Sequence, residues 1–294
     1  MDEGGKAATV VYGRSGRVAT IELNRPERRN ALSAELLVDL DAAIDQLEAD
    51  PGASVCVVRG RGPSFCAGFD LGAGSASAAS SRSDPWADRA RLRAWIATAL
   101  RLLETPTPVI AEIHGHCLAG GSLFLICADL VCVADDCVIG WAKLPMGAGF
   151  MDGALAQLIG VRRAKQLSFA VGSEISGREA CEWGLANFTF PADRLRAATE
   201  AYAESLARAP RDVLQIRKAA INRAVGGGLR DAALAGAEWD AIAHVTPAVD
   251  EVRGLVREHG MKAVIASFQE DEPPFAELRD GAGPADPTSV QPSN

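Results

Sequence analysis

The sequence lacks an apolar run approaching the about 20 residues that a helix needs to cross a lipid bilayer. Its N-terminal stretch, MDEGGKAATVVYG, also lacks the basic segment followed by an apolar one that marks a secretory leader. We therefore expect a cytoplasmic protein with no membrane partner.

The cysteines show no CxxC spacing, and their number, seven, is odd. Most of them fall inside apolar runs, where a cysteine packs as a small hydrophobic residue. This pattern predicts reduced thiols and no metal site, and it disfavours a disulfide framework. The residues concerned are Cys56, Cys66, Cys117, Cys127, Cys132, Cys137 and Cys181.

Positive charge is in deficit, because the formal net charge is −8. Such a balance disfavours a nucleic-acid partner. It leaves room for an anionic small molecule, since Arg25, Arg28 and Arg29 form a local basic cluster. We expect no nucleic-acid partner.

What the chain does have is length and apolar content: 294 residues, of which 48% are hydrophobic and 23% charged. It can bury a large core. Strands and helices alternate along it, which predicts an α/β fold with a parallel sheet and right-handed crossovers. The expected elements are a hairpin over 8–24, a helix over 34–50 capped by Ser33, a strand over 54–60, a helix around 90–103, a strand over 108–115, a helix from 120 and a strand over 130–135.

The regions outside this pattern divide the chain further. Gly72 to Pro85 reads as a small polar surface loop, and Ser176 with Glu179 predicts a capping box. We expect an N-terminal extension over 1–9, a core over 10–192, a helical region over 193–268 and a disordered tail over 269–294. No internal repeat is visible.

The stretch HGHCLAGGSLFLICAD, residues 114–129, places Gly120 and Gly121 directly before an apolar run that reads as a buried helix. Main-chain N–H groups at such a helix start can point at a substrate oxygen. A site of this kind usually also needs a side chain that moves a proton. Here Ser122, Leu123 and Phe124 follow the glycines, and none of them is an acid.

Four ordered blocks resemble the crotonase, or enoyl-CoA hydratase/isomerase, superfamily over about residues 10–261. They are LNRPERRNALSAEL, RGRGPSFCAGFDL, PTPVIAEIHGHCLAGGSLFLICADLVCVAD and LIGVRRAKQLSFAVGSEISGREACEWGLAN. The resemblance implies a crotonase-like (ββα)-repeat spiral core with a helical C-terminal region, and an acyl-CoA thioester as substrate. It also implies assembly as a homotrimer or homohexamer, and no cofactor apart from the coenzyme A of the substrate.

The family polarises the thioester carbonyl with two backbone N–H groups, which the resemblance assigns to Phe69 and Gly120. Both would stabilise negative charge developing on the oxygen. The coenzyme A is expected to lie near the opening block and the first oxyanion block. The residues implied there are Arg28, Arg29, Ala31, Ala67, Asp70 and Leu71. A guanidinium group suits phosphate by charge and geometry.

Two positions depart from the family's hydratases, which use two glutamates. Leu123 and Lys143 stand where those acids would be. Leucine cannot transfer a proton, and lysine serves as a base only if burial lowers its pKa considerably. The site therefore lacks the two acids that the family's hydratases use to hydrate an enoyl thioester.

Other side chains could transfer a proton or shape the pocket. Asp152 lies in the glycine-rich loop where divergent members of the family carry an aspartate, and it could equally cap the following helix. Lys143 and His116 are the other candidates for proton transfer. We expect Trp141 to shape the acyl pocket together with Leu123, Glu112 to be exposed, and Cys66 to serve packing.

We therefore expect an acyl-CoA enzyme that stabilises an enolate or a tetrahedral oxyanion, of the lyase, isomerase or hydrolase type, and not a standard enoyl-CoA hydratase. Two alternatives stay open at this point. One is a non-catalytic acyl-CoA-binding protein, and the other a C–C hydrolase of a cyclic diketone.

Overall fold

The computed structural model describes residues 7–72, 84–141, 147, 150–225 and 228–270. Most of the loop between Gly72 and Pro85, the tail from residue 271 on, and Lys143 lie outside the described residues. Among the helices that are described, none is long and apolar enough to cross a membrane.

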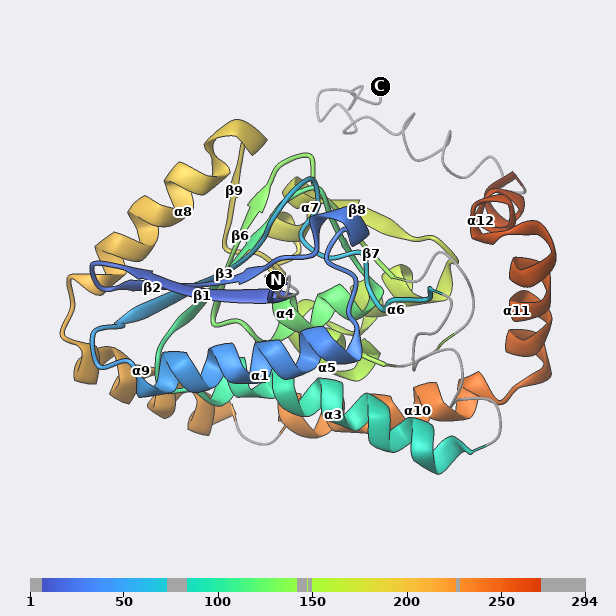
Figure 1. Ribbon diagram of the computed structural model, residues 1–294, viewed down its shortest axis with the longest axis horizontal. Helices are drawn as coiled ribbons and strands as arrows, with labels where there is room; N and C mark the ends of the chain where they lie inside the picture. The colour runs from blue at the N-terminus through green and yellow to red at the C-terminus, as the bar shows by residue number, and fades with distance from the viewer. Residues whose placement is uncertain (1–6, 73–83, 142–146, 148–149, 226–227, 271–294) are drawn as a thin grey trace, which may run out of the picture.

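The larger of two sheets carries six strands in the order β1-β2-β3-β4-β6-β9 (Figure 1). β1 and β2 form the antiparallel hairpin that the sequence predicts, and every later neighbour in the sheet pairs in parallel. The expected parallel sheet is thus confirmed. Its strands are β1 (Val10–Ser15), β2 (Val18–Leu23), β3 (Val55–Gly60), β4 (Val109–Ile113), β6 (Leu130–Ala134) and β9 (Phe188–Phe190).

A second sheet of three short strands, in the order β5-β7-β8, was not predicted. Its members are β5 (His116–Leu118), β7 (Val138–Gly140) and β8 (Glu174–Ser176). Strands of three residues are too short to show a hydrophobic period. They form because the chain folds back on itself beside the larger sheet, which no local pattern reveals.

Helices cover both faces of the six-stranded sheet (Figure 1). α1 packs on β1 and β2, whereas α8 packs on the other face, against β2, β3, β4, β6 and β9. The helices that follow the sheet strands and the second sheet are α1 (Ala34–Ala49), α3 (Pro85–Glu104), α4 (Ser122–Cys127), α5 (Asp152–Ile159), α6 (Val161–Phe169), α7 (Gly177–Glu182) and α8 (Ala192–Ala207). Two 3-10 turns, η1 (Pro26–Arg28) and η2 (Ala119–Gly121), precede α1 and α4.

The helix starts follow from capping chemistry. The Ser33 side chain accepts a hydrogen bond from the Leu36 amide, and Ser176 forms the predicted capping box with Glu179. α3 begins five residues before the expected start, at Pro85, because the Asp84 side chain accepts from the two amides that follow that proline.

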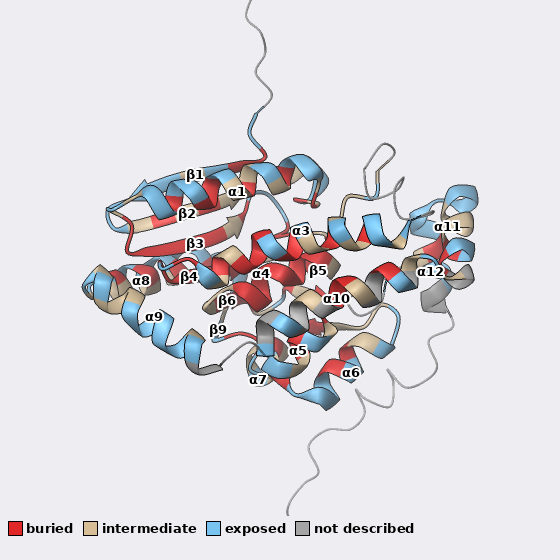
Figure 2. Ribbon diagram, turned by 90° about the horizontal axis from the view of Figure 1, so that it is seen from below, coloured by how far each residue is buried: buried red, intermediate tan, exposed pale blue. Residues whose placement is uncertain are grey.

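Buried side chains form one large core between the sheet and the helices α1, α3 and α4 (Figure 2). Four helices follow α8. They are α9 (Arg211–Val225), α10 (Gly228–His244), α11 (Pro247–His259) and α12 (Met261–Glu270). α10 packs on α3 and α5, whereas α11 and α12 pack on each other around a small cluster of their own.

A buried ion pair anchors α9 to the core. The Lys218 ammonium lies 2.6 Å from the Asp129 carboxylate and also donates to the carbonyl oxygens of Leu102 and Thr107. Asp129 in turn accepts from the Val109 amide. Burial raises the pKa of Asp129 and lowers the pKa of Lys218, and their mutual attraction opposes both shifts.

Replacing Lys218 by Met is expected to lower the free energy of unfolding by about 3–5 kcal/mol, because it leaves Asp129 as an uncompensated buried charge. The Lys218→Met and Asp129→Asn double variant should recover part of this loss. Arg178→Met is the control, since Arg178 pairs with Asp135 while 68% exposed and should cost at most about 1 kcal/mol. Urea unfolding followed by circular dichroism measures all three. Equal losses for Lys218→Met and Arg178→Met would contradict the prediction.

Candidate active site

The first oxyanion segment is a turn at Gly68, which has a φ of +92°. The turn pairs with the opening block: the Leu32 amide donates to the Gly68 carbonyl at 2.8 Å, and the Asp70 amide donates to the Leu32 carbonyl at 2.9 Å. Because amides alternate in direction along an extended segment, the Phe69 N–H points away from this pairing. Within the described residues, the Phe69 N–H donates to no backbone carbonyl.

The second segment is brought alongside by β5. The Cys66 amide donates to the His116 carbonyl, and the Leu118 amide donates to the Cys66 carbonyl, both at 3.0 Å. A Cβ added to Gly68 would stand 3.0 Å from the Leu118 carbonyl oxygen and 3.6 Å from the Gly120 nitrogen. The positive φ and this close approach together require glycine at position 68.

The Gly120 amide lies at the start of a helical segment, in the turn η2 that runs into α4. Ala119, directly before it, is held at a φ of +46°, a left-handed conformation that costs energy for any residue with a side chain. The Ser122 hydroxyl donates to the Ala119 carbonyl at 2.6 Å and fixes this turn. In the part of the chain that the structure describes, the Gly120 N–H has no backbone acceptor.

The structure brings together Phe69 and Gly120, the two residues that the resemblance assigns to the oxyanion hole, and within the described residues neither N–H donates to a backbone carbonyl. A Cβ on Gly120 would come within 2.9 Å of the Phe69 ring, so the two residues are direct neighbours. Two such donors beside one another can bind an oxygen that gains negative charge. The Phe69 ring itself packs edge-on against Trp95 at 5.6 Å and Phe150 at 5.3 Å between centroids.

The expected coenzyme A residues gather on one edge of this site. The Ala67 amide donates to the Arg29 carbonyl, which joins the opening block to the first oxyanion block. Arg28 and Arg29 are exposed, as a phosphate contact requires, and Ala31 is half-buried. Leu71 is 41% exposed.

Asp70 is engaged by Arg25, which the sequence indicated only as part of a basic cluster. Their side chains form an ion pair at 2.9 Å, and Arg25 also donates to the Ala31 carbonyl. Burial raises the pKa of Asp70, but hydrogen bonds from the Gly72 amide and Arg25 outweigh it and bring this pKa below its usual value. Asp70 thus holds Arg25 and the turn in place.

Asn30 is a structural residue of this site that the sequence did not reveal. It is fully buried at a φ of +55°, and its side chain accepts from the Arg25 amide and donates to the carbonyls of Arg61 and Ser64. These bonds lock the opening block onto the segment before Gly68. A short polar residue that tolerates a left-handed conformation was the available signal.

The resemblance places the two hydratase glutamates at positions 123 and 143, and the structure describes only the first of these residues. Leu123 is 1% exposed and lies on α4, three residues after Gly120, within the hydrophobic core. It offers no group for proton transfer. The prediction for Lys143 falls outside the described residues.

Asp152 is the first residue of α5, but it does not cap that helix. The cap position is Met151, and the Asp152 Oδ1 atom instead accepts from the Trp141 indole at 2.6 Å and from the Ser168 hydroxyl at 2.9 Å. The capping prediction is therefore wrong, because two side chains from other segments take up this carboxylate. Trp141, expected to shape the acyl pocket, acts here as a hydrogen-bond donor.

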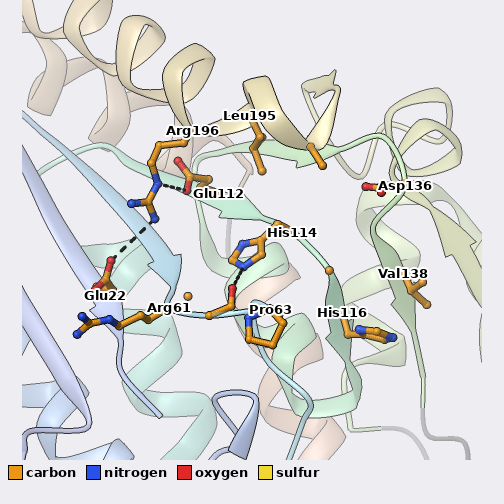
Figure 3. A pocket seen from close by; sticks show the side chains of 14 residues that line it. Glu22, Arg61, Pro63, Glu112, His114, His116, Asp136, Val138, Leu195 and Arg196 are labelled. Carbon is orange, nitrogen blue, oxygen red and sulfur yellow. Dashed lines mark hydrogen bonds and ion pairs between the residues drawn. The ribbon is translucent and has the colours of Figure 1, made fainter. Parts of the chain in front are cut away.

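His116 faces a cavity of about 840 Å³ at the carboxyl ends of the parallel strands (Figure 3). Its Nδ1 atom lies 3.2 Å from the Ser64 hydroxyl, so it is a hydrogen-bonded wall residue. Neither Phe69 nor Gly120 lines this cavity. His116 therefore lines a cavity to which the two proposed oxyanion residues do not contribute.

Glu112 lines the same cavity and is 2% exposed, so the expectation that it is exposed is wrong. Arg196, from the helix α8 that covers this face of the sheet, lies 3.8 Å from it. Burial raises the pKa of Glu112, while the charges of Arg59 and Arg196 oppose the shift. A strand-end position does not reveal that a helix from later in the chain will close over it.

The thiols behave as predicted. All seven cysteines are free, and six of them are buried. Burial raises the pKa of the Cys66 thiol to about 12, so this residue beside the oxyanion turn is unreactive packing. Among the described residues, no cluster of histidine, cysteine and acidic side chains could hold a metal ion.

Two amides without a backbone acceptor among the described residues, one at a turn and one at a helix start, are the arrangement expected of a class of protein that stabilises negative charge on a carbonyl oxygen. The comparison with known families agrees, because the family model described as "Enoyl-CoA hydratase/isomerase" matches residues 13–263. The chain belongs to the enoyl-CoA hydratase/isomerase family, a family of acyl-CoA enzymes, and it has the crotonase-like fold that its sequence predicts.

Individual relatives cover most of the chain. A Thermus thermophilus protein, whose name assigns it provisionally to the enoyl-CoA hydratases, is 32% identical over 90% of this chain and 99% of its own. The hydroxycinnamoyl-CoA hydratase-lyase of Pseudomonas fluorescens is 30% identical over 74% of this chain and 80% of its own. The crystal structure of an enoyl-CoA hydratase/isomerase from Xanthobacter autotrophicus Py2 is similar with a TM-score of 0.83 and 31% identity, over 91% of this chain and 100% of that one.

Proposed function

We propose that this protein stabilises an enolate or a tetrahedral oxyanion of an acyl-CoA thioester and is not a standard enoyl-CoA hydratase. The observation that carries the proposal is Leu123, a buried leucine three residues after Gly120, where the resemblance places one hydratase glutamate. Among the described residues, the Phe69 and Gly120 amides have no backbone acceptor. The site keeps its means of stabilising charge and lacks a usual means of activating water.

The two amides would act on the thioester oxygen. When a proton, a carboxyl group or an acyl fragment leaves the α-carbon, the electron pair moves onto that oxygen, where two fixed N–H dipoles stabilise the resulting charge. Decarboxylation, double-bond migration and C–C cleavage all pass through such a species. These reactions correspond to a lyase, an isomerase or a hydrolase.

Asp152 is the first choice for the group that moves the proton. Its carboxylate has a fixed orientation, because Trp141 and Ser168 both donate to Oδ1, and no described residue bonds to Oδ2. A positioned carboxylate of this kind is suited to general acid–base catalysis. Lys143 and His116 are the alternatives, although His116 lines a cavity to which neither Phe69 nor Gly120 contributes.

One relative supports a reaction other than simple hydration. The protein from Pseudomonas fluorescens is named a hydratase-lyase, so the family as sampled by these comparisons includes lyase chemistry. The test is a panel of β-keto, malonyl-type and 3-enoyl thioesters of coenzyme A, assayed with the purified protein by mass spectrometry of the products. We expect turnover of at least one panel member, and no turnover of any would refute an enzymatic function of this kind.

Coenzyme A binding is expected to depend on Arg28 and Arg29. Replacing both by Ala should weaken binding of a coenzyme A thioester about tenfold or more and reduce its dependence on salt, because two exposed guanidinium groups that contact phosphate are lost. Arg178→Ala, a change at another exposed arginine, is the matched control. Isothermal titration calorimetry at two salt concentrations measures the effect. Unchanged affinity in the double variant would show that the phosphates bind elsewhere.

A further inference from the structure

One basic side chain lies against the oxyanion turn and has no part in the proposed function so far. It is Arg91 on α3, whose guanidinium carbon stands 6.0 Å from the centroid of the Phe69 ring. Its side chain is 18% exposed, so it is neither sealed in the core nor free in solvent. Trp95, four residues later on the same face of α3, packs on the same ring.

The guanidinium of Arg91 is held in a fixed orientation. Its Nε and Nη2 atoms donate to Oδ1 of Asp88 at 2.9 and 2.6 Å, and Asp88 is fully buried. The other carboxylate oxygen, Oδ2, lies 2.5 Å from Nδ1 of His244 on α10. Two helices thus fix one carboxylate, and this carboxylate fixes Arg91.

In this arrangement Arg91 still has one nitrogen that can donate a hydrogen bond to a ligand. Its third nitrogen, Nη1, has no partner among the described residues, whereas Nε and Nη2 are both used. The negative charge of Asp88 is also shared, since His244 takes one of its two oxygens. Arg91 therefore presents a cation with an unused donor beside the residue whose amide forms half of the oxyanion hole.

The groups around Arg91 indicate which kind of acyl group its unused donor would bind. The other groups packed on the Phe69 ring are aromatic, namely Trp95 and Phe150. A neutral aliphatic acyl chain would gain nothing from Arg91 and would leave its N–H without an acceptor, which is unfavourable. A carboxylate on the chain would accept from it in a charge-assisted hydrogen bond.

We propose that Arg91 recognises a negatively charged group on the acyl chain, and that the substrates of this protein are coenzyme A thioesters of dicarboxylic acids. This inference rests on the proposed function, because it places the thioester carbonyl at the Phe69 and Gly120 amides. It adds the chemical class of the acyl group and assigns a specificity-determining role to Arg91.

The test compares acyl groups of matched length with and without a terminal carboxylate. Succinyl-CoA is paired with butyryl-CoA and glutaryl-CoA with pentanoyl-CoA, and their dissociation constants are measured by calorimetry. The unmodified protein is expected to bind at least one carboxylated member about 10- to 100-fold more tightly than its neutral partner. Arg91→Met should abolish that preference by weakening binding of the carboxylated member alone, and Arg91→Lys should keep part of it because the charge remains.

Two further variants keep the test decisive. Arg93→Met is the matched control, since Arg93 lies on the same helix, is 38% exposed, stands 3.7 Å from Glu238 and should leave the preference unchanged. If Arg91→Met fails to fold because Asp88 is left with one partner fewer, the Asp88→Asn and Arg91→Met double variant removes both charges and is expected to lose the preference.

The failure of this inference is distinguishable from the failure of the proposed function. Equal affinity for both members of each pair, or a preference that persists without Arg91, would overturn the inference while leaving acyl-CoA binding intact. If no thioester of either kind binds, the proposed function fails as well.

Discussion

Crotonyl-CoA is expected to be hydrated at a negligible rate. Each missing proton-transfer group typically costs about 10²- to 10⁴-fold in rate, and the two hydratase glutamates act as a unit, so losing both removes most of the catalysis. Here one position holds the buried Leu123 and the other Lys143. The expected progress curve in the ultraviolet, where the enoyl thioester absorbs, is indistinguishable from that of a blank.

A family hydratase that carries both glutamates, assayed in parallel, is the positive control for this measurement. Leu123→Glu tests the reason: it restores one acid only, and we expect hydration to stay far below that of the control enzyme. The variant should also melt at a lower temperature, because a carboxyl group is placed in the core. Robust hydration of crotonyl-CoA by the unmodified protein would contradict the proposal that it is not a standard hydratase.

Asp152→Asn is expected to lower kcat by about 10²- to 10⁴-fold on whichever thioester the protein turns over. The asparagine oxygen can still accept from Trp141 and Ser168, so the local structure and the melting temperature should change little. What is lost is the carboxylate itself, and KM should therefore stay within a few-fold of its original value. Steady-state kinetics with a panel substrate provides the measurement.

Two companions separate chemistry from positioning at Asp152. Ser168→Ala removes one of the two donors to Oδ1 and leaves the carboxylate, so it should cost much less than Asp152→Asn. Trp141→Phe removes the other donor and should lie between the two. Unchanged kcat in Asp152→Asn would remove Asp152 from the mechanism, and Lys143 and His116 would be the next residues to substitute.

The local elements of this fold were predictable because their signals are local. Ser33 starts α1 by accepting an amide hydrogen bond three residues on, and Ser176 with Glu179 closes a capping box within four residues. The runs that form β1, β2 and β3 are rich in β-branched residues, and turn residues bound them in the sequence itself. The start of α3 lies before the predicted one because its cap, Asp84, follows a polar stretch of sequence in which no apolar repeat marks the boundary.

In the candidate site, too, some residues could be assigned from the sequence and others only from the structure. Gly68 and Gly120 could be assigned from their surrounding blocks, because backbone donors at a turn and at a helix start need only the right local conformation. Side chains that contact distant parts of the fold could not be assigned from the sequence. Asp152 looked like a helix cap, and Glu112 looked exposed, until Trp141 and α8 were in place around them.

By itself, then, the sequence determined the parallel α/β core, which rests on residue identity and short-range spacing. Its resemblance to the family assigned the two oxyanion amides and the two positions without hydratase acids. Only the tertiary structure decided which side chains meet: Asp152 with Trp141 and Ser168, and Asp88 with Arg91 and His244. The last of these groups joins positions 156 residues apart. Such contacts form because α3 and α10 pack together, and no pattern within either segment specifies its partner.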